Sequence, residues 1–166
     1  FGYGASFTPI SLVSTYAMLV NGGYHVSPKI IKNLETKKKR VFSENLSRDI
    51  RELLHNVVIN GSGKKAYVNG IDIGGKTGTA RKTNNKNYGD KVITSFIGVF
   101  PITKPKYIIF ILLDEPHKIN SEALYGGNTA APIFSRILKR IAIDIKIYPE
   151  KKLEITKKKS LYNETF

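Results

Sequence analysis

The sequence contains no cysteine, and only 13 of its 166 residues are acidic. Without cysteine the chain can form no disulfide and can perform no thiol chemistry. Its longest apolar run, Tyr107 to Leu113, falls far short of the ~20 residues that a membrane-spanning helix needs. No signal peptide is visible and the first residue is Phe1 rather than Met. We therefore expect a globular piece of a longer protein.

The scarcity of acidic residues leaves 27 basic side chains largely uncompensated, with a formal charge of +14. Such an excess can serve binding to nucleic acid, to an anionic membrane surface or to an anionic polymer. The two basic runs, residues 37–40 and 157–159, contain no aromatic side chains on which bases could stack. We interpret them as a solvated loop and tail and expect no nucleic-acid partner. A basic nucleic-acid-binding module, or another non-catalytic interaction module, remains the alternative.

Two helices are predicted in the first 60 residues. Thr8 as N-cap and Pro9 in the first turn predict the start of one helix, and Asn21-Gly22-Gly23 predicts its end. An extended segment is expected over residues 24–34. A second helix is expected to begin at Ser47, and its apolar positions at i, i+3, i+4, i+7 and i+8 are Ile50, Leu53, Leu54, Val57 and Val58.

The second half of the chain is dominated by strand patterns. Strands are expected at residues 71–80, 92–100 and 106–113, with a polar loop over 82–90 and a turn over 101–105. A last helix is expected to start at Asn128 or Thr129. This order predicts an α+β fold in which an antiparallel sheet is packed with helices.

The most informative stretch runs from Ile71 to Ala80, where Lys76, Thr77 and Thr79 stand among glycines. In a strand, residues two apart share a face, so the hydroxyls of Thr77 and Thr79 could meet one carboxylate. Lys76 points to the other face and must reach the same cleft along its stem. Glycine allows a ligand to come close. The stretch therefore suits the binding of an anionic, extended substrate.

Three interpretations of this stretch compete. Residues 70–77 match the phosphate-loop pattern G-x-x-x-x-G-K-[ST], but that motif needs a helix after it, and residues 79–87 have no apolar helical period. A plain glycine-rich edge strand is the second interpretation. The third is the Lys-Thr-Gly strand of serine acyltransferases that act on D-alanyl peptides and β-lactams. The flanking chain has to decide between them.

Short motifs on both sides of the stretch favour the third interpretation. In chain order they are Gly2-Tyr3-Gly4 with Ser6 and Thr8-Pro9, Tyr16-Ala17 with Asn21-Gly22-Gly23, Gly61-Ser62-Gly63-Lys64-Lys65-Ala66, Gly75-Lys76-Thr77-Gly78-Thr79-Ala80, Asp114-Glu115-Pro116, Tyr125-Gly126-Gly127 and Ala131-Pro132-Ile133-Phe134. This ordered set, from Gly2 to about Pro149, resembles the C-terminal part of the transpeptidase domain of class B penicillin-binding proteins of the cell-division, septal type.

The resemblance implies a partial transpeptidase domain over residues 1–149 and a charged C-terminal tail over 150–166. It implies that the parent protein is a serine-type peptidoglycan D,D-transpeptidase that cross-links stem peptides during septal cell-wall synthesis and binds β-lactams. In this family's scheme Thr77, Gly78 and Thr79 bind the substrate, and the Thr79 N–H is one of two oxyanion donors. Lys76 would lie beside the serine of a Ser-x-Asn element. The implied location is the periplasmic face of the bacterial inner membrane.

The family also needs Ser-x-x-Lys and then Ser-x-Asn ahead of Lys-Thr-Gly. The strings Ser62-Gly63-Lys64-Lys65 and Ser43-Glu44-Asn45 occur in the reverse order, and Ser62 lies in a glycine-flanked turn rather than at a helix start. We interpret both strings as coincidental. The nucleophile is expected before Phe1, so the 166-residue chain alone is expected to be inactive.

Three further expectations concern other residues. His25, His55 and His117 are far apart without a shared ligand spacing, so no metal and no cofactor are expected. Asp114 and Glu115 are adjacent and would point apart, which favours a turn over an acid pair. The strand over 106–113 is apolar, and without an N-terminal strand beside it the chain would expose a sheet edge suited to homo-oligomer formation.

Overall fold

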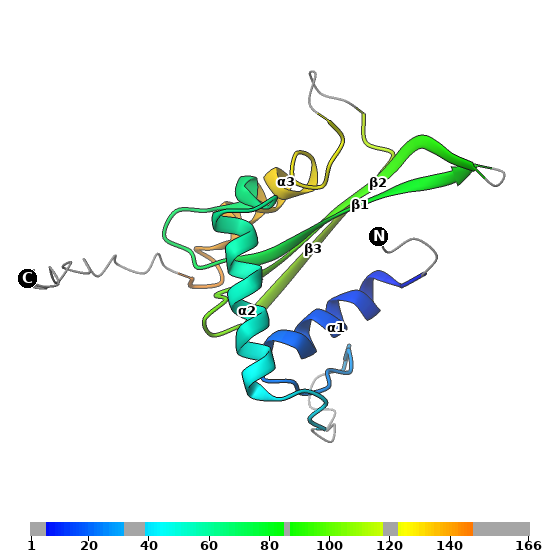
Figure 1. The fold of residues 1–166 in the computed structure, drawn as a ribbon. Helices are drawn as coiled ribbons and strands as arrows, with labels where there is room; N and C mark the ends of the chain where they lie inside the picture. Colours follow the sequence, from blue (N-terminus) through cyan, green and yellow to red (C-terminus); the bar gives the residue numbers. More distant parts are fainter. Residues whose placement is uncertain (1–5, 32–38, 85–86, 118–122, 148–166) are drawn as a thin grey trace, which may run out of the picture.

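The computed structural model describes residues 6–31, 39–84, 87–117 and 123–147 (Figure 1). The first motif of the resemblance, Gly2-Tyr3-Gly4, and the charged tail over 150–166 lie outside these ranges. In chain order the elements are α1 (Pro9–Val20), α2 (Glu44–Ile59), the 3₁₀ helix η1 (Lys64–Ala66), β1 (Gly74–Asn84), β2 (Asn87–Phe100), β3 (Tyr107–Asp114) and α3 (Ala130–Ile141). The strands form one antiparallel sheet in the order β1-β2-β3. The predicted α+β fold is confirmed.

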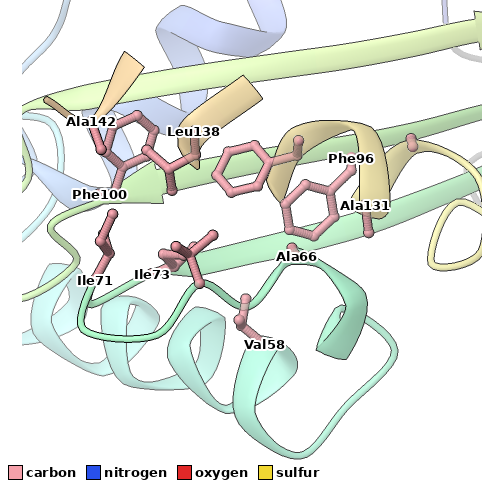
Figure 2. Packing of buried hydrophobic residues seen from close by; sticks show 12 residues of the cluster. Val58, Ala66, Ile71, Ile73, Phe96, Phe100, Ala131, Leu138 and Ala142 are labelled. Carbon is pink, nitrogen blue, oxygen red and sulfur yellow. The ribbon is translucent and has the colours of Figure 1, made fainter. Parts of the chain in front are cut away.

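Helix α3 covers one face of the sheet. The ring of Phe134 lies 5.0 Å from that of Phe96 and 5.9 Å from that of Phe100, both in edge-to-face geometry. A Cβ atom on Gly98 would come within 2.2 Å of the Phe134 ring, so glycine lets the helix lie directly on the strand. Figure 2 shows the core that results, with members such as Ile71, Ile73, Ala131 and Leu138.

Helices α1 and α2 supply the packing of the opposite face. Val20 of α1 and Leu54 of α2 are buried with Val99 and Ile102, and Tyr16 packs against this cluster. Burial raises the pKa of the Tyr16 phenol. Because α2 also contributes Val58 to the cluster beneath α3, it joins the two apolar clusters at the start of β1.

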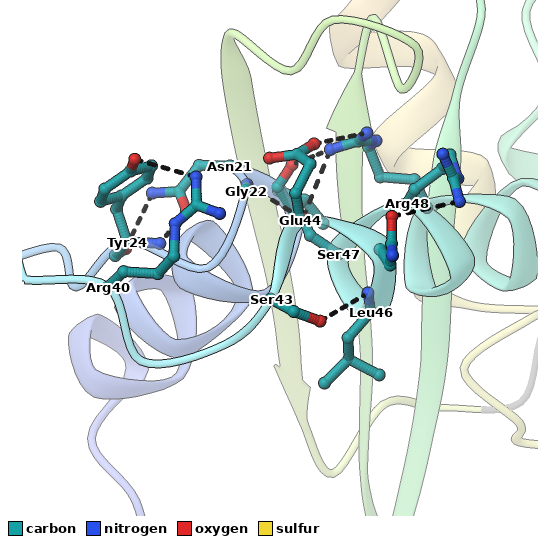
Figure 3. A network of polar contacts seen from close by, with 12 residues as sticks. Asn21, Gly22, Tyr24, Arg40, Ser43, Glu44, Leu46, Ser47 and Arg48 are labelled. Carbon is teal, nitrogen blue, oxygen red and sulfur yellow. Dashed lines mark hydrogen bonds and ion pairs between the residues drawn. The ribbon is translucent and has the colours of Figure 1, made fainter.

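The prediction that the second helix begins at Ser47 is wrong. Ser43 is the N-cap of α2, and its hydroxyl accepts the Leu46 N–H at 3.2 Å (Figure 3). Ser47 is buried inside the helix, where its hydroxyl accepts the Gly22 N–H at 3.0 Å and so ties α2 to the end of α1. The apolar stripe is also narrower than predicted, since Leu53 is 66% exposed.

The polar loop predicted over residues 82–90 is wrong for residues 82–84 and 87–90, and residues 85–86 lie outside the described ranges. Strand β1 extends to Asn84 and β2 begins at Asn87, with a shift in register between Arg81 and Thr83. This part of the hairpin lacks the apolar alternation by which a strand is predicted, so polar composition suggested a loop. Within residues 24–31 of the predicted extended segment there is no strand, only a bridge between Tyr24 and Arg40. Residues 32–34 of that segment lie outside the described residues.

Candidate active site

The Lys-Thr-Gly segment lies on β1, which is an edge strand among the described elements. The Glu115 N–H donates to the Val92 carbonyl at 3.0 Å and continues the β2–β3 register. The backbone N–H and C=O groups of the even-numbered residues of β2 therefore point towards β3. The direction of these groups alternates from one residue to the next, so the N–H and C=O of Ser95 point towards β1, where Ser95 lies opposite Gly78. It follows that the N–H groups of Thr77 and Thr79 point away from β2, towards the open side of the sheet.

The hydroxyls of Thr77 and Thr79 lie on the face that α3 covers. Thr77 pairs with Phe96 and Thr79 with Thr94, and directly opposite residues share a face. Phe96 packs on α3, and the Thr94 hydroxyl accepts a hydrogen bond from Thr129 at 2.8 Å. The prediction that the two threonines share a face is confirmed.

Lys76 starts from the other face and reaches the open edge along its stem. It pairs with Ile97, one residue out of phase with the threonines. Its ammonium donates to the Thr77 carbonyl at 2.7 Å. The carbonyl of Thr77 points away from β2 by the same alternation, so this bond brings the cation to the open edge. A cation, two hydroxyls and outward N–H groups therefore meet along one stretch of β1.

The loop before α3 closes over this stretch through two glycines. The Gly126 N–H donates to Thr79 Oγ1 at 3.0 Å. A Cβ on Gly126 would lie 2.3 Å from the Ser95 carbonyl oxygen and 2.5 Å from that of Gly78, and one on Gly127 would lie 2.3 Å from the Ser62 carbonyl oxygen. Only glycine allows such close approach, so Gly126 packs directly on the backbone of β1 and β2, and Gly127 packs on the backbone of Ser62.

Ser62 contacts the site in a way that the sequence did not predict. It follows α2 in a turn, and the next helix in the chain is the three-residue η1, whose N-cap is Gly63, so Ser62 does not stand at the start of a helix that could carry a Ser-x-x-Lys nucleophile. Its hydroxyl lies 2.8 Å from Thr77 Oγ1. No local signal marks this contact, because it joins residues 15 positions apart across two elements. The other string, Ser43-Glu44-Asn45, is the start of α2.

The phosphate-loop interpretation is wrong. After Thr77 the chain continues as strand β1 to Asn84, so no helix N-terminus follows Lys76 to hold a phosphate.

Asp114 and Glu115 do not point apart as predicted; both hold the ammonium of Lys82. Its nitrogen lies 2.8 Å from Asp114 Oδ1 and 2.7 Å from Glu115 Oε1, and Lys91 binds Glu115 Oε2 at 2.7 Å. Hydrogen bonds lower the pKa of Glu115 to about 2, the larger effect coming from Lys82 and the smaller from Lys91. The hydrogen bonds that Lys82 makes raise its own pKa, with the larger effect from Asp114 and the smaller from Glu115. Glu115 has a φ of 51°, unfavourable for this residue type, and these contacts offset the cost. The cluster fastens the β1–β2 hairpin to the end of β3.

Among the described residues no group of three or more histidine, aspartate or glutamate side chains is arranged to hold a metal ion. The ring nitrogen Nδ1 of His55 lies 3.3 Å from Asp72 Oδ1 and 3.0 Å from the Ile73 carbonyl oxygen. Within the same residues no helix is long and apolar enough to cross a membrane.

Comparison with known proteins shows the family of this chain. The family model "Penicillin binding protein transpeptidase domain" matches residues 1–139. The chain belongs to this family. The resemblance to penicillin-binding proteins that the short motifs indicated is therefore confirmed.

Two curated relatives of this transpeptidase-domain chain illustrate the match. Stage V sporulation protein D of Bacillus subtilis is 36% identical over 179 residues, covering 99% of this chain and 27% of the relative. The peptidoglycan D,D-transpeptidase FtsI homolog of Mesostigma viride is 33% identical over 175 residues, covering 90% of this chain and 29% of the relative. The chain thus spans less than a third of the length of these relatives.

Solved structures of penicillin-binding proteins have the same fold as this chain. The apo transpeptidase domain of Burkholderia pseudomallei penicillin-binding protein 3 superposes with a TM-score of 0.77 at 29% identity, over 91% of this chain and 46% of that one. Penicillin-binding protein 3 of Mycobacterium tuberculosis, complexed with ampicillin, gives a TM-score of 0.77 at 26% identity, over 92% of this chain and 38% of that one. The α+β fold of this chain is that of part of a transpeptidase domain.

Proposed function

We propose that this sequence forms one wall of the active site of a serine-type peptidoglycan D,D-transpeptidase. The complete protein would cross-link stem peptides during septal cell-wall synthesis, at the periplasmic face of the inner membrane, and would be acylated by β-lactams. The observation that carries the proposal is the open edge of β1, where the Thr79 N–H points outward beside the hydroxyls of Thr77 and Thr79. The names of the relatives, several of them peptidoglycan D,D-transpeptidases, support the same activity.

The chemistry assigned to this wall is binding and charge stabilisation. A D-alanyl-D-alanine end laid along β1 would place its terminal carboxylate at the hydroxyls of Thr77 and Thr79. The carbonyl oxygen of the bond to be broken would accept from the Thr79 N–H. As a serine hydroxyl attacks that carbonyl carbon, negative charge develops on the oxygen, and a donor held in place there is worth about 3 kcal/mol of transition-state stabilisation.

The remaining steps need groups that this sequence does not supply. The attacking serine passes its proton to a base, the C–N bond breaks, and the terminal D-alanine leaves with a proton on its amine. The amine of a neighbouring strand then takes the acyl group from the serine. Because no Ser-x-x-Lys precedes a Ser-x-Asn and the Lys-Thr-Gly segment here, we assign the serine and its base to residues outside the 166. Lys76 contributes a positive charge at the edge where the carboxylate and the developing oxyanion lie.

The test is labelling by a fluorescent penicillin. The full-length protein should take up one equivalent in a covalent bond that survives denaturation, and the 166-residue chain should take up none. Absence of labelling of the full-length protein would refute the proposed activity. A stoichiometric adduct on the isolated chain, on Ser62 for example, would refute the assignment of the nucleophile to other residues. A salt titration with random duplex DNA tests the alternative that the basic charge suggests, because a nucleic-acid binder loses affinity steeply as salt rises.

A further inference from the structure

We propose that Ser62 is a positioning residue for the acyl donor: it donates a hydrogen bond to Thr77 Oγ1 and so directs the one hydroxyl hydrogen of Thr77 to the substrate carboxylate. This inference rests on the proposed function and deepens it. It gives a role to a side chain that lies on neither β1 nor the loop before α3. The carrying observation is the distance of 2.8 Å between Ser62 Oγ and Thr77 Oγ1.

The turn that carries Ser62 is fixed by its backbone. The Gly63 N–H donates to the Val57 carbonyl at 2.9 Å, which folds the chain back on the last turn of α2. A Cβ on Gly61 would lie 2.9 Å from the Val57 backbone, and one on Gly63 would lie 3.1 Å from the Val57 carbonyl oxygen. On its other side the Ser62 carbonyl is packed against Gly127. The serine therefore has little freedom to move away from Thr77.

The number of hydrogens decides the direction of the bond. A hydroxyl has one hydrogen to donate and two lone pairs to accept with, whereas a carboxylate only accepts. If Thr77 donated to Ser62, it would have no hydrogen left for the carboxylate. If Ser62 donates, the chain runs from Ser62 to Thr77 to the carboxylate and every oxygen is satisfied. The anion strengthens the bond that it accepts, and successive hydrogen bonds polarise one another. Carboxylate binding therefore selects this direction.

The position of the pair on the sheet makes its effect specific to the carboxylate. Thr77 is two residues from Thr79, whose N–H is the proposed oxyanion donor, and Ser62 has no hydrogen bond to Thr79 among the contacts that the structure describes. Loss of the Ser62 hydroxyl should therefore weaken recognition of the carboxylate and leave the oxyanion donor in place.

The experiment compares two probes on the full-length protein: a penicillin with a free carboxylate and the methyl ester of the same penicillin. For Ser62→Ala we expect the second-order rate constant of acylation by the free acid to fall about tenfold, the size of one ordinary hydrogen bond. The rate constant for the ester should change less than about twofold, and Ser62→Thr, which keeps the hydroxyl, should restore the reaction of the free acid. Adding Ser62→Ala to Thr77→Val should cause no further loss, because the partner is already gone.

The outcomes separate this inference from the proposed function. Provided that wild-type protein reacts with the free acid, any of three results refutes the role of Ser62 and leaves the proposed function standing. Ser62→Ala could react with the free acid as fast as wild type, Ser62→Ala could react more slowly with both probes to the same extent, or Ser62→Thr could fail to restore the rate. If wild-type protein reacts with neither probe, the proposed function falls and this inference falls with it.

Discussion

The Gly126 N–H donates a hydrogen bond to Thr79 Oγ1 at 3.0 Å and joins residues 47 positions apart. Through this bond the loop before α3 fixes the side chain of a residue whose own N–H points to the open edge of the sheet. The bond is possible because Gly126 lies directly on the backbone of Gly78 and Ser95. The geometry of the candidate site therefore depends on a residue that itself carries no side chain.

Replacing Gly126 should disturb both the fold and the site. In Gly126→Ala the new Cβ would lie 2.3 Å from the Ser95 carbonyl oxygen, so the loop must move away from β1. We expect a loss of roughly 1–3 kcal/mol in stability and slower acylation of the full-length protein, measured as a lower melting temperature and a lower rate constant with fluorescent penicillin. Gly89→Ala is the matched control, because the nearest atom to its Cβ is 3.6 Å away. Equal behaviour of the two variants would show that the close packing of Gly126 is unimportant.

The ion pairs around Glu115 should make the end of β3 sensitive to pH. The folded-state pKa of Glu115 is lowered from 4.5 to about 2, so its contribution to stability is present above pH 4.5 and is lost as the pH falls towards about 2. We expect the protection of the Glu115 amide, which donates to Val92, against hydrogen exchange to drop over this range. In the variant Glu115→Gln the protection of this amide should already be lower at neutral pH and should change little as the pH falls. A protection factor that stays equal in the two proteins at neutral pH would contradict the role given to the ion pairs.

The outer edge of β3 should make the isolated chain self-associate. Among the described elements β3 pairs only with β2, and it carries the apolar run Tyr107 to Leu113. Unpaired backbone groups along such a strand are a template for another strand. We predict a dimer or larger assembly of the 166-residue chain at micromolar concentration, measured by light scattering. A monomeric mass together with amides protected along β3 would mean that the chain covers its own edge.

Elements with local signals were predicted well. Thr8, Pro9 and the Asn21-Gly22-Gly23 stop define α1 as the structure has it, and the apolar run Tyr107 to Leu113 lies within β3. Alternation along a strand also placed Thr77 and Thr79 on one face, because that depends only on their spacing. These features follow from neighbouring residues, so the sequence contains them.

Features that depend on distant contacts were not predictable. Ser43 and Ser47 are equally suited to cap a helix, and what assigns Ser47 to the interior is its bond to Gly22, in another helix. The long polar hairpin is held partly by Lys82, which meets Asp114 and Glu115 more than 30 positions later. Ser62 reaches Thr77 only because the chain turns back after α2. In each case two segments have to be brought together before the role of the residue becomes visible.

The most direct measurement of the central claim compares Thr79→Pro with Thr79→Val in the full-length protein. Both remove the hydroxyl, but only proline removes the N–H. Proline is tolerated on an edge strand where the N–H faces away from the sheet, so both variants should keep a native circular-dichroism spectrum. We expect acylation by penicillin to be about 100-fold or more slower in Thr79→Pro than in Thr79→Val, the effect of losing one oxyanion donor. Equal acylation rates in the two folded variants would contradict the assignment of the Thr79 N–H to the oxyanion hole.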